Sequence, residues 1–224
     1  MATILNIETS TKNCSVSISK GTDLLICKEL NTGGYSHAEM LHPFIHDCIK
    51  ETGISFSDLD AVSVGKGPGS YTGLRIGVSA AKGLCFANDL KLISINSLEI
   101  LASAFSSEKG IIVPMIDARR MEVYSAVFDH HHSWLRKTEA QVIDENSFES
   151  YLKNGPVYFM GDGAEKCKSI IQHENAHFVD DLFPSAKDMI GLSNEKYAKS
   201  EFENVAYFEP YYLKDFVVTP QKKK

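Results

Sequence analysis

The chain has 224 residues, of which 43% are apolar and 23% charged, a composition ordinary for a globular protein with one large domain or two lobes. Its formal net charge of −6 argues against a protein that binds nucleic acid on its own, because such a protein needs a basic face. Five scattered cysteines form no C-x-x-C pair, so we expect neither a disulfide framework nor a zinc knuckle. The sequence shows neither a signal peptide nor a membrane-spanning run, so we expect a cytoplasmic protein.

The first 53 residues predict three strands and a helix. Residues 3–30 divide into three β-type runs, and in "CSVSIS" the apolar residues Val16 and Ile18 alternate with polar ones. "HAEMLHPFIHDCIKETG" repeats apolar residues at spacings of three and four, which predicts a helix that ends at Gly53. Pro43 lies inside this helix, so we expect a kink or a helix start near it.

The next segment predicts a strand, a glycine-rich turn and a second helix. The strand is expected at Ala61–Val64, the turn is "KGPGSYTG", and the helix covers about Gly73–Phe86. "LKLISINSL" then predicts another strand, and "SLEILASAFSS" predicts a short helix.

The opening pattern recurs in the second half of the chain. Residues 110–143 predict three more strands, and Asp117 ends the first of them as Glu8 ends the first strand of the opening set. The remainder predicts a strand, a Gly-Asp-Gly turn and a helix, then a short strand, a loop and a last helix. Repetition at this scale suggests two related lobes, which we place at residues 1–105 and 106–224, with a C-terminal segment that can pack back on the first lobe.

The glycine-rich turn resembles a phosphate-binding loop but lacks the chemistry of one. A Walker-type loop needs Gly-Lys-Ser/Thr at the start of a helix, whereas Lys66 precedes the turn here. In the helix that follows, Gly73, Gly77 and Ala81 share one face, and glycine is unfavourable in a helix by about 1 kcal/mol relative to alanine. The row therefore predicts a close approach, either to a partner chain or to another part of this chain. Replacing Gly77 by leucine should block association in the first case and lower the melting temperature in the second.

Four segments resemble one known family. "ILNIETST", "VSVGKGPGSYTGLRIGVSAAKGL", "IDARRMEVYSAVF" and "PYYLKD" are similar to the TsaB (YeaZ) family across nearly the whole chain, and the Gly-Pro-Gly segment is the specific one. The resemblance implies an α/β protein with the two-lobe actin/sugar-kinase/Hsp70-like ATPase (RNase H-like) fold and a duplicated strand–helix core. It also implies an accessory protein for threonylcarbamoyladenosine formation on tRNA, related to the catalytic TsaD family.

The resemblance also implies which functional residues are missing. TsaD-like proteins carry H-x-x-x-H, whose histidines face one metal, but the matching positions here are Ser97 and Leu101. We therefore expect neither a catalytic residue nor a metal site. Glu8, Thr9 and Ser10 resemble the first phosphate turn of the fold and are the candidate cofactor-binding residues. No intrinsic cofactor is expected, and ATP is expected only as a weak ligand or within a complex.

The implied function is that of a non-catalytic scaffold. The implied partners are a TsaD-type catalytic subunit and a small TsaE-type ATPase, which together transfer threonylcarbamoyl to N6 of adenosine 37 of tRNA. Contact with tRNA is expected to be indirect, and a homodimer is a further expectation. We predict the contact surface on the helices at Glu39–Ile49 and Gly73–Cys85, through Met40, Leu41, Phe44, Ile45, Gly73, Gly77 and Ala81.

The sequence leaves three alternative functions open. An ATP-dependent kinase of the same fold would need acidic residues for magnesium, and Glu8 and Asp117 are available. A metallopeptidase would need a metal pair or a nucleophile with its base, and the sequence offers no suitable spacing. A direct tRNA-binding module would use basic residues such as Lys222–Lys224, against the acidic balance of the chain.

Overall fold

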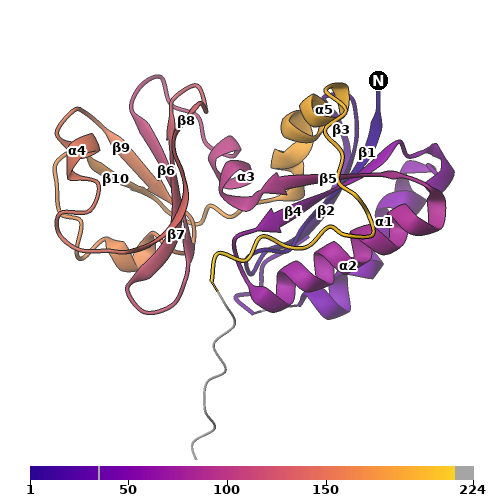
Figure 1. Ribbon diagram of the computed structural model, residues 1–224, viewed down its shortest axis with the longest axis horizontal. Coiled ribbons are helices and arrows are strands. Elements are labelled where there is room, and N and C mark those ends of the chain that lie inside the picture. The colour runs from indigo at the N-terminus through magenta and orange to yellow at the C-terminus, as the bar shows by residue number, and fades with distance from the viewer. Residues whose placement is uncertain (35, 215–224) are drawn as a thin grey trace, which may run out of the picture.

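The chain forms two five-stranded mixed sheets with the same internal arrangement. The computed structural model describes residues 1–34 and 36–214, and the predicted tRNA contact at Lys222–Lys224 lies outside them. The first sheet has the order β3-β2-β1-β4-β5 and the second the order β10-β9-β6-β7-β8. In each sheet an antiparallel three-stranded meander is extended by two parallel strands (Figure 1). The duplicated core expected from the sequence is therefore confirmed.

The elements alternate along the chain in the same way in both halves. The strands are β1 (Thr3–Glu8), β2 (Cys14–Lys20), β3 (Asp23–Leu30), β4 (Ala61–Gly67), β5 (Lys91–Asn96), β6 (Ile111–Asp117), β7 (Glu122–Asp129), β8 (Trp134–Val142), β9 (Val157–Met160) and β10 (Ala176–Val179). The α-helices are α1 (His37–Thr52), α2 (Tyr71–Asn88), α3 (Ser97–Ser103), α4 (Glu149–Leu152) and α5 (Ile190–Ala198). Short 3₁₀ turns are η1 (Phe56–Asp58), η2 (Glu165–Cys167) and η3 (Ala186–Met189).

Helices α1 and α2 cover one face of the first sheet. Leu5 and Ile7 of β1 point to this face and pack with apolar residues of both helices, while Ile4 points to the opposite face, as the two-residue period of a strand requires. Helix α1 ends where predicted, because Gly53 adopts a left-handed conformation (φ 69°) that caps it. It does not start at Pro43, however: the helix begins at His37 and runs through the proline.

Helix α3 joins the two sheets and lies between them (Figure 1). Its inward residues Leu98 and Leu101 are fully buried and pack against Ile112 and Phe128 of the second sheet. The other face of the second sheet is covered by the segments around α4 and η2. Here the sequence prediction was wrong, because the helix expected after the Gly-Asp-Gly turn is only the 3₁₀ turn η2. The amides of Cys167 and Lys168 bond carbonyls three residues back, which is the 3₁₀ pattern.

The C-terminal segment returns to the first lobe. Ala186 and Met189 are fully buried against Ile4, Ala61 and Ile93, so η3 and α5 cover the face of the first sheet that α1 and α2 leave open. No helix of residues 1–34 and 36–214 combines the length and the apolar character required to cross a lipid bilayer.

The tail after α5 then runs along α2 towards the second lobe (Figure 1). Lys82 of α2 donates hydrogen bonds to the carbonyl oxygens of Ala206 and Phe208, at 3.3 and 2.8 Å. Further along, the amide of Tyr211 donates to the carbonyl of Lys66 at 2.8 Å. Lys214 forms an ion pair with Glu122 of β7, so the tail makes contacts with both lobes.

Candidate functional site

The candidate phosphate turn lies at the carboxyl end of β1 and is buried. Glu8 and Thr9 have no exposed surface, and Ser10 is only 1% exposed. The amide N–H of Ser10, which could serve an anion, donates to Glu8 Oε1 at 2.5 Å. The carboxylate of the protein itself therefore occupies the donor that a phosphate would use.

Glu8 fits a space that is shaped by its neighbours. The hydroxyl of Ser97, at the start of α3, donates to Glu8 Oε2 at 3.4 Å. Gly65 of the adjacent strand β4 lies on the other side, where a Cβ atom would overlap Glu8 Oε2. Burial raises the pKa of Glu8, and the hydrogen bonds from Ser10 and Ser97 oppose this effect only in part.

The raised pKa of Glu8 predicts a pH-dependent stability that Glu8→Gln should remove. A folded-state pKa above the unfolded value of about 4.5 stabilises the fold below that pH, and this contribution is lost as pH rises through the folded-state pKa. The glutamine carries no charge and keeps an oxygen for Ser10. We expect the variant to gain stability over the wild type as pH increases, with a slope of up to about 1.4 kcal/mol per pH unit.

Urea unfolding of both proteins between pH 4.5 and 8 measures this difference. Glu145→Gln removes an exposed carboxylate and serves as the control. A difference between Glu8→Gln and the wild type that stays constant over the whole pH range would contradict the prediction.

The glycine row of α2 faces this turn of the same chain. A Cβ atom on Gly73 would overlap the carbonyl oxygen of Thr9, and one on Gly77 would overlap Thr9 Oγ1. The Thr9 hydroxyl also donates to the carbonyl of Gly73 at 2.8 Å. The close approach predicted from the row exists, but it is made within the chain.

Two further contacts close the turn. The amide of Ser70 donates to the carbonyl of Ser10 at 2.7 Å, and the imidazole Nε2–H of His37 donates to the carbonyl of Thr11 at 2.8 Å. Burial lowers the pKa of His37, which favours the neutral ring in this position. The amino-terminal ends of α1 and α2 thus cover the turn from both sides, and a phosphate could reach it only if they moved.

The other predicted contact residues also turn inward. Leu41 and Ala81 are fully buried and Ile45 is 3% exposed, while Met40 and Phe44 are half-buried against the same core. These residues and the glycine row are therefore packed within this chain, and a contact with a partner through them stays a prediction. The apolar stripe of each amphipathic helix packs on its own sheet, as it does in most globular proteins.

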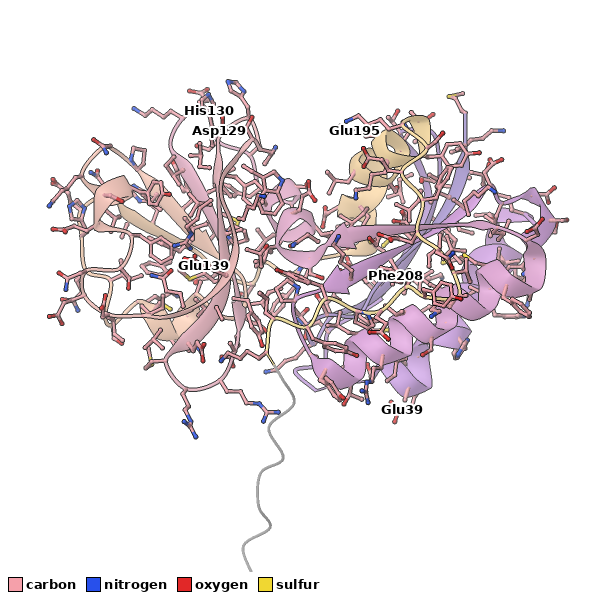
Figure 2. All side chains as sticks on the ribbon, in the orientation of Figure 1. Glu39, Asp129, His130, Glu139, Glu195 and Phe208 are labelled. Carbon is pink, nitrogen blue, oxygen red and sulfur yellow. The ribbon has the colours of Figure 1, made fainter. Side chains whose placement is uncertain are left out.

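A different set of residues faces outward on the same helices. Phe86 near the end of α2 is 87% exposed, and Gly83 has open space around it, with nothing within 4 Å of a Cβ atom. Tyr207, next to the Ala206 carbonyl that Lys82 holds, is 84% exposed. Figure 2 shows Glu39 of α1 pointing away from the sheet on this side of the molecule. In the sequence, Gly83 and Phe86 are three residues apart and lie off the apolar stripe of α2, and this spacing could have indicated the face.

The corresponding strand end of the second lobe is held by a lysine. Lys166 forms an ion pair with Asp117 and donates hydrogen bonds to the carbonyl oxygens of Arg120 and Glu122, at 2.7 and 2.6 Å. The Asp162 carboxyl group accepts a hydrogen bond from the amide of Asp117 at 3.0 Å. Burial raises the pKa of Asp162. An ammonium group therefore occupies the position beside Asp117 where a kinase would require a magnesium ion.

The positions that would carry metal-binding histidines lie at the junction of the lobes. Ser97 also accepts from the amide of Gly67 at 3.2 Å, and Leu101 packs against Gly161 in the apolar core between the sheets. Among residues 1–34 and 36–214, no three His, Cys, Asp or Glu side chains are grouped so that they could hold a metal ion.

Comparison with known proteins decides the family. The model of the family described as TsaD, tRNA N6-adenosine threonylcarbamoyltransferase, matches residues 33–222. The curated tRNA threonylcarbamoyladenosine biosynthesis protein TsaB of Bacillus subtilis (strain 168) is 32% identical over 176 residues, 76% of this chain and 75% of that protein. This chain belongs to the TsaB (YeaZ) family. The TsaB protein of Escherichia coli (strain K12) is 29% identical over 222 residues, 96% of this chain and 95% of that protein.

Solved structures agree with the assignment to the TsaB family. YeaZ from Pseudomonas aeruginosa superposes with a TM-score of 0.79 at 26% identity, over 95% of this chain and 100% of that chain. The ethanolamine utilization protein EutJ from Carboxydothermus hydrogenoformans, at 10% identity and a TM-score of 0.52 over 85% of this chain and 89% of that chain, shares the fold alone. The two-lobe actin/sugar-kinase/Hsp70-like ATPase fold expected from the sequence is confirmed.

Proposed function

We propose that this chain is the accessory, non-catalytic subunit of the machinery that forms N6-threonylcarbamoyladenosine at position 37 of tRNA. Its role is to bind and support a TsaD-type catalytic subunit in the cytoplasm. The complete assembly includes a small TsaE-type ATPase, and tRNA is bound through the catalytic subunit. The match of curated TsaB proteins along almost the full chain supports the pathway.

The burial of Leu101 is the observation that supports a non-catalytic role for this chain. At this position the resemblance to the transferase implies a metal-binding histidine, and the leucine is instead fully buried between the two sheets. Ser97, one turn earlier, is engaged with Gly67 and Glu8. An apolar side chain in a closed core cannot bind a metal ion, which favours a supporting role.

The kinase and metallopeptidase alternatives receive no support from these contacts. A kinase needs Glu8 and Asp117 at an accessible magnesium site, but Glu8 is buried and Asp117 pairs with Lys166. ATP remains a proposal only as a weak ligand or as a ligand of the complete complex. A homodimer of the free chain is a separate proposal.

We propose that the catalytic subunit docks on the outward side of α1 and α2. Gly83 lets a partner helix approach the backbone of α2 closely, and Phe86 and Tyr207 offer large apolar side chains beside it. This surface replaces the inward-facing residues expected from the sequence alone.

Substitution of Gly83 by arginine tests the proposed function. The variant should fold normally, because nothing lies within 4 Å of the new Cβ atom. Its affinity for the TsaD-type subunit of the same genome should fall at least about tenfold, as expected when a close contact worth about 1.4 kcal/mol or more is lost. Modification of tRNA by the complete set of subunits should fall with it. Affinity is measured by calorimetry and the modified nucleoside by mass spectrometry.

The matched control is Gly191→Arg on α5, the opposite side of the first sheet. Gly191 is also an exposed helical glycine with open space around it, so this variant should bind and support modification as the wild type does. Unchanged binding by Gly83→Arg would refute the docking surface. Modified nucleoside formed by this chain without the catalytic subunit would refute the accessory role itself.

A further inference from the structure

A cleft of about 530 Å³ lies between the two lobes, away from the buried turn at Glu8. Its walls come from four separate parts of the chain: the ends of β4 and β5 with α3, the strand β8, the helix α5, and the tail. The lining residues are Lys66, Asn96, Glu99, Trp134, Lys137, Thr138, Lys196 and Tyr211. Figure 2 shows two of these walls, with Asp129 and His130 marking the hairpin before β8 and Glu195 marking α5. The volume is within the range of roughly 300–1,000 Å³ that is usual for small-molecule sites.

The cleft is positively charged in a protein whose net charge is −6. Three lysines line it, against the single carboxylate of Glu99. Within the part of the chain that the structure describes, neither Lys66 nor Lys137 has an ion pair, and Lys196 has only a distant one with Glu201, at 3.9 Å. Ammonium groups gathered around one space without matching carboxylates favour an anion there.

The surroundings of Lys66 disfavour its charged form, as the direction of its pKa shift indicates. Burial lowers the pKa of Lys66, and the positive charge of Lys196 lowers it further, while the carboxylates of Glu203 and Glu99 oppose both effects without cancelling them. Burial raises the pKa of Glu99, which lies beside Lys196 and accepts a hydrogen bond from Trp134, so this carboxyl group compensates the lysines only in part. A bound anion would relieve the repulsion between the two ammonium groups.

Two aromatic side chains complete the cleft. Trp134 is 40% exposed although one side of its ring packs on Phe128, with the ring centroids 4.3 Å apart. Tyr211 is 39% exposed, and its amide is fixed on the carbonyl of Lys66. A hydrogen bond links two walls of the cleft, because the side-chain amide of Asn96 in β5 donates to the Thr138 hydroxyl in β8 at 2.9 Å. Aromatic faces beside ammonium groups form the kind of surface on which proteins hold a base and its phosphate.

We propose that this cleft binds a small anionic molecule that carries a planar ring, of the chemical class of a nucleoside phosphate. The lysines at its edges hold the anionic group, and Trp134 and Tyr211 pack against the ring. The ligand contacts both lobes and the tail at once. This site uses none of Glu8, Thr9 and Ser10, and it does not depend on the proposed function, which is tested with the catalytic partner.

Trp134 is the sole tryptophan of the chain, so its fluorescence reports on the cleft directly. We expect AMP to quench it saturably, with a matching heat in calorimetry. Adenosine, which lacks the anion, and ribose 5-phosphate, which lacks the ring, should each bind at least about tenfold more weakly. AMP should also raise the melting temperature, because binding to the folded state alone stabilises it.

Lysine variants locate the site. Lys66→Gln and Lys196→Gln should each weaken AMP binding about tenfold, through loss of a charge-assisted contact. Lys137→Gln changes a third lysine of the cleft at an exposed position, so it gives the same test if either of the first two variants folds poorly. Lys109→Gln, on an exposed loop outside the cleft, should bind as the wild type does. No saturable signal with AMP by either method, ribose 5-phosphate binding as tightly as AMP, or unchanged affinity in the folded cleft variants would each overturn the proposal.

Discussion

The Gly77→Leu variant should melt about 6–12 °C below the wild type, because the leucine side chain has no space to occupy. Its first carbon would already overlap Thr9 Oγ1, and Thr9 is fixed by its hydrogen bond to Gly73. Overpacking of a buried site costs about 3 kcal/mol at the upper end of the usual range, and each kcal/mol lowers the melting temperature of a chain of this size by about 2–4 °C. Calorimetry of the isolated protein measures the change.

The same substitution six positions later is the matched control. Gly83 lies on the outward side of α2, where a Cβ atom meets nothing within 4 Å. Gly83→Leu should therefore leave the melting temperature unchanged or raise it slightly, since leucine is the better helix former. If Gly77→Leu melts with the wild type, the contact between α2 and the Thr9 turn is not as close as described.

Substitution of Lys166 by methionine should lower the free energy of unfolding by about 1.5 kcal/mol. Methionine keeps the length of the side chain but cannot replace the ion pair with Asp117 or the hydrogen bonds to the carbonyls of Arg120 and Glu122. The Glu122 carbonyl is then left part-buried without its donor, whereas water can reach the Asp117 carboxylate and the Arg120 carbonyl. The loss of one such bond to a charged group costs about 1.5–3 kcal/mol. Urea unfolding measures the loss.

Lys168→Met separates this effect from the removal of any surface charge. The ammonium group of Lys168 pairs with Glu165 and Asp180, both at 2.5 Å, but these carboxylates are exposed and water replaces the lysine. Only a small change in stability is therefore expected. Equal stability losses in the two variants would show that Lys166 has no special role at the end of β6.

The sequence predicted which residues lie on one face better than it predicted what that face meets. The spacing of Gly73, Gly77 and Ala81 correctly indicated a close approach. The partner in that approach is Thr9. Its hydroxyl donates a hydrogen bond to the Gly73 carbonyl, although the two residues are 64 positions apart in the sequence. Periodicity reports which side of a helix is crowded, and it contains no information on the segment that folds against it.

The two strand-end acids show the same limit. Glu8 and Asp117 were correctly placed at the ends of equivalent strands, yet their surroundings could not be read from the pattern. Glu8 depends on the missing side chain of Gly65, and Asp117 depends on Lys166, 49 residues further on. Local patterns determined most strands, and the chemistry of each carboxylate was determined by long-range contacts.

The return of the C-terminal segment to the first lobe has a consequence for synthesis on the ribosome. The apolar face formed by Ile4, Ala61 and Ile93 stays uncovered until Ala186 and Met189 have been made. The second sheet is continuous from Ile111 to Val179, so it can complete its folding while the older half of the nascent chain is still unfinished. The half of the protein that is translated first is therefore the last to complete its core. Until residues 186–189 have been made, it exposes an apolar surface of the kind that chaperones bind.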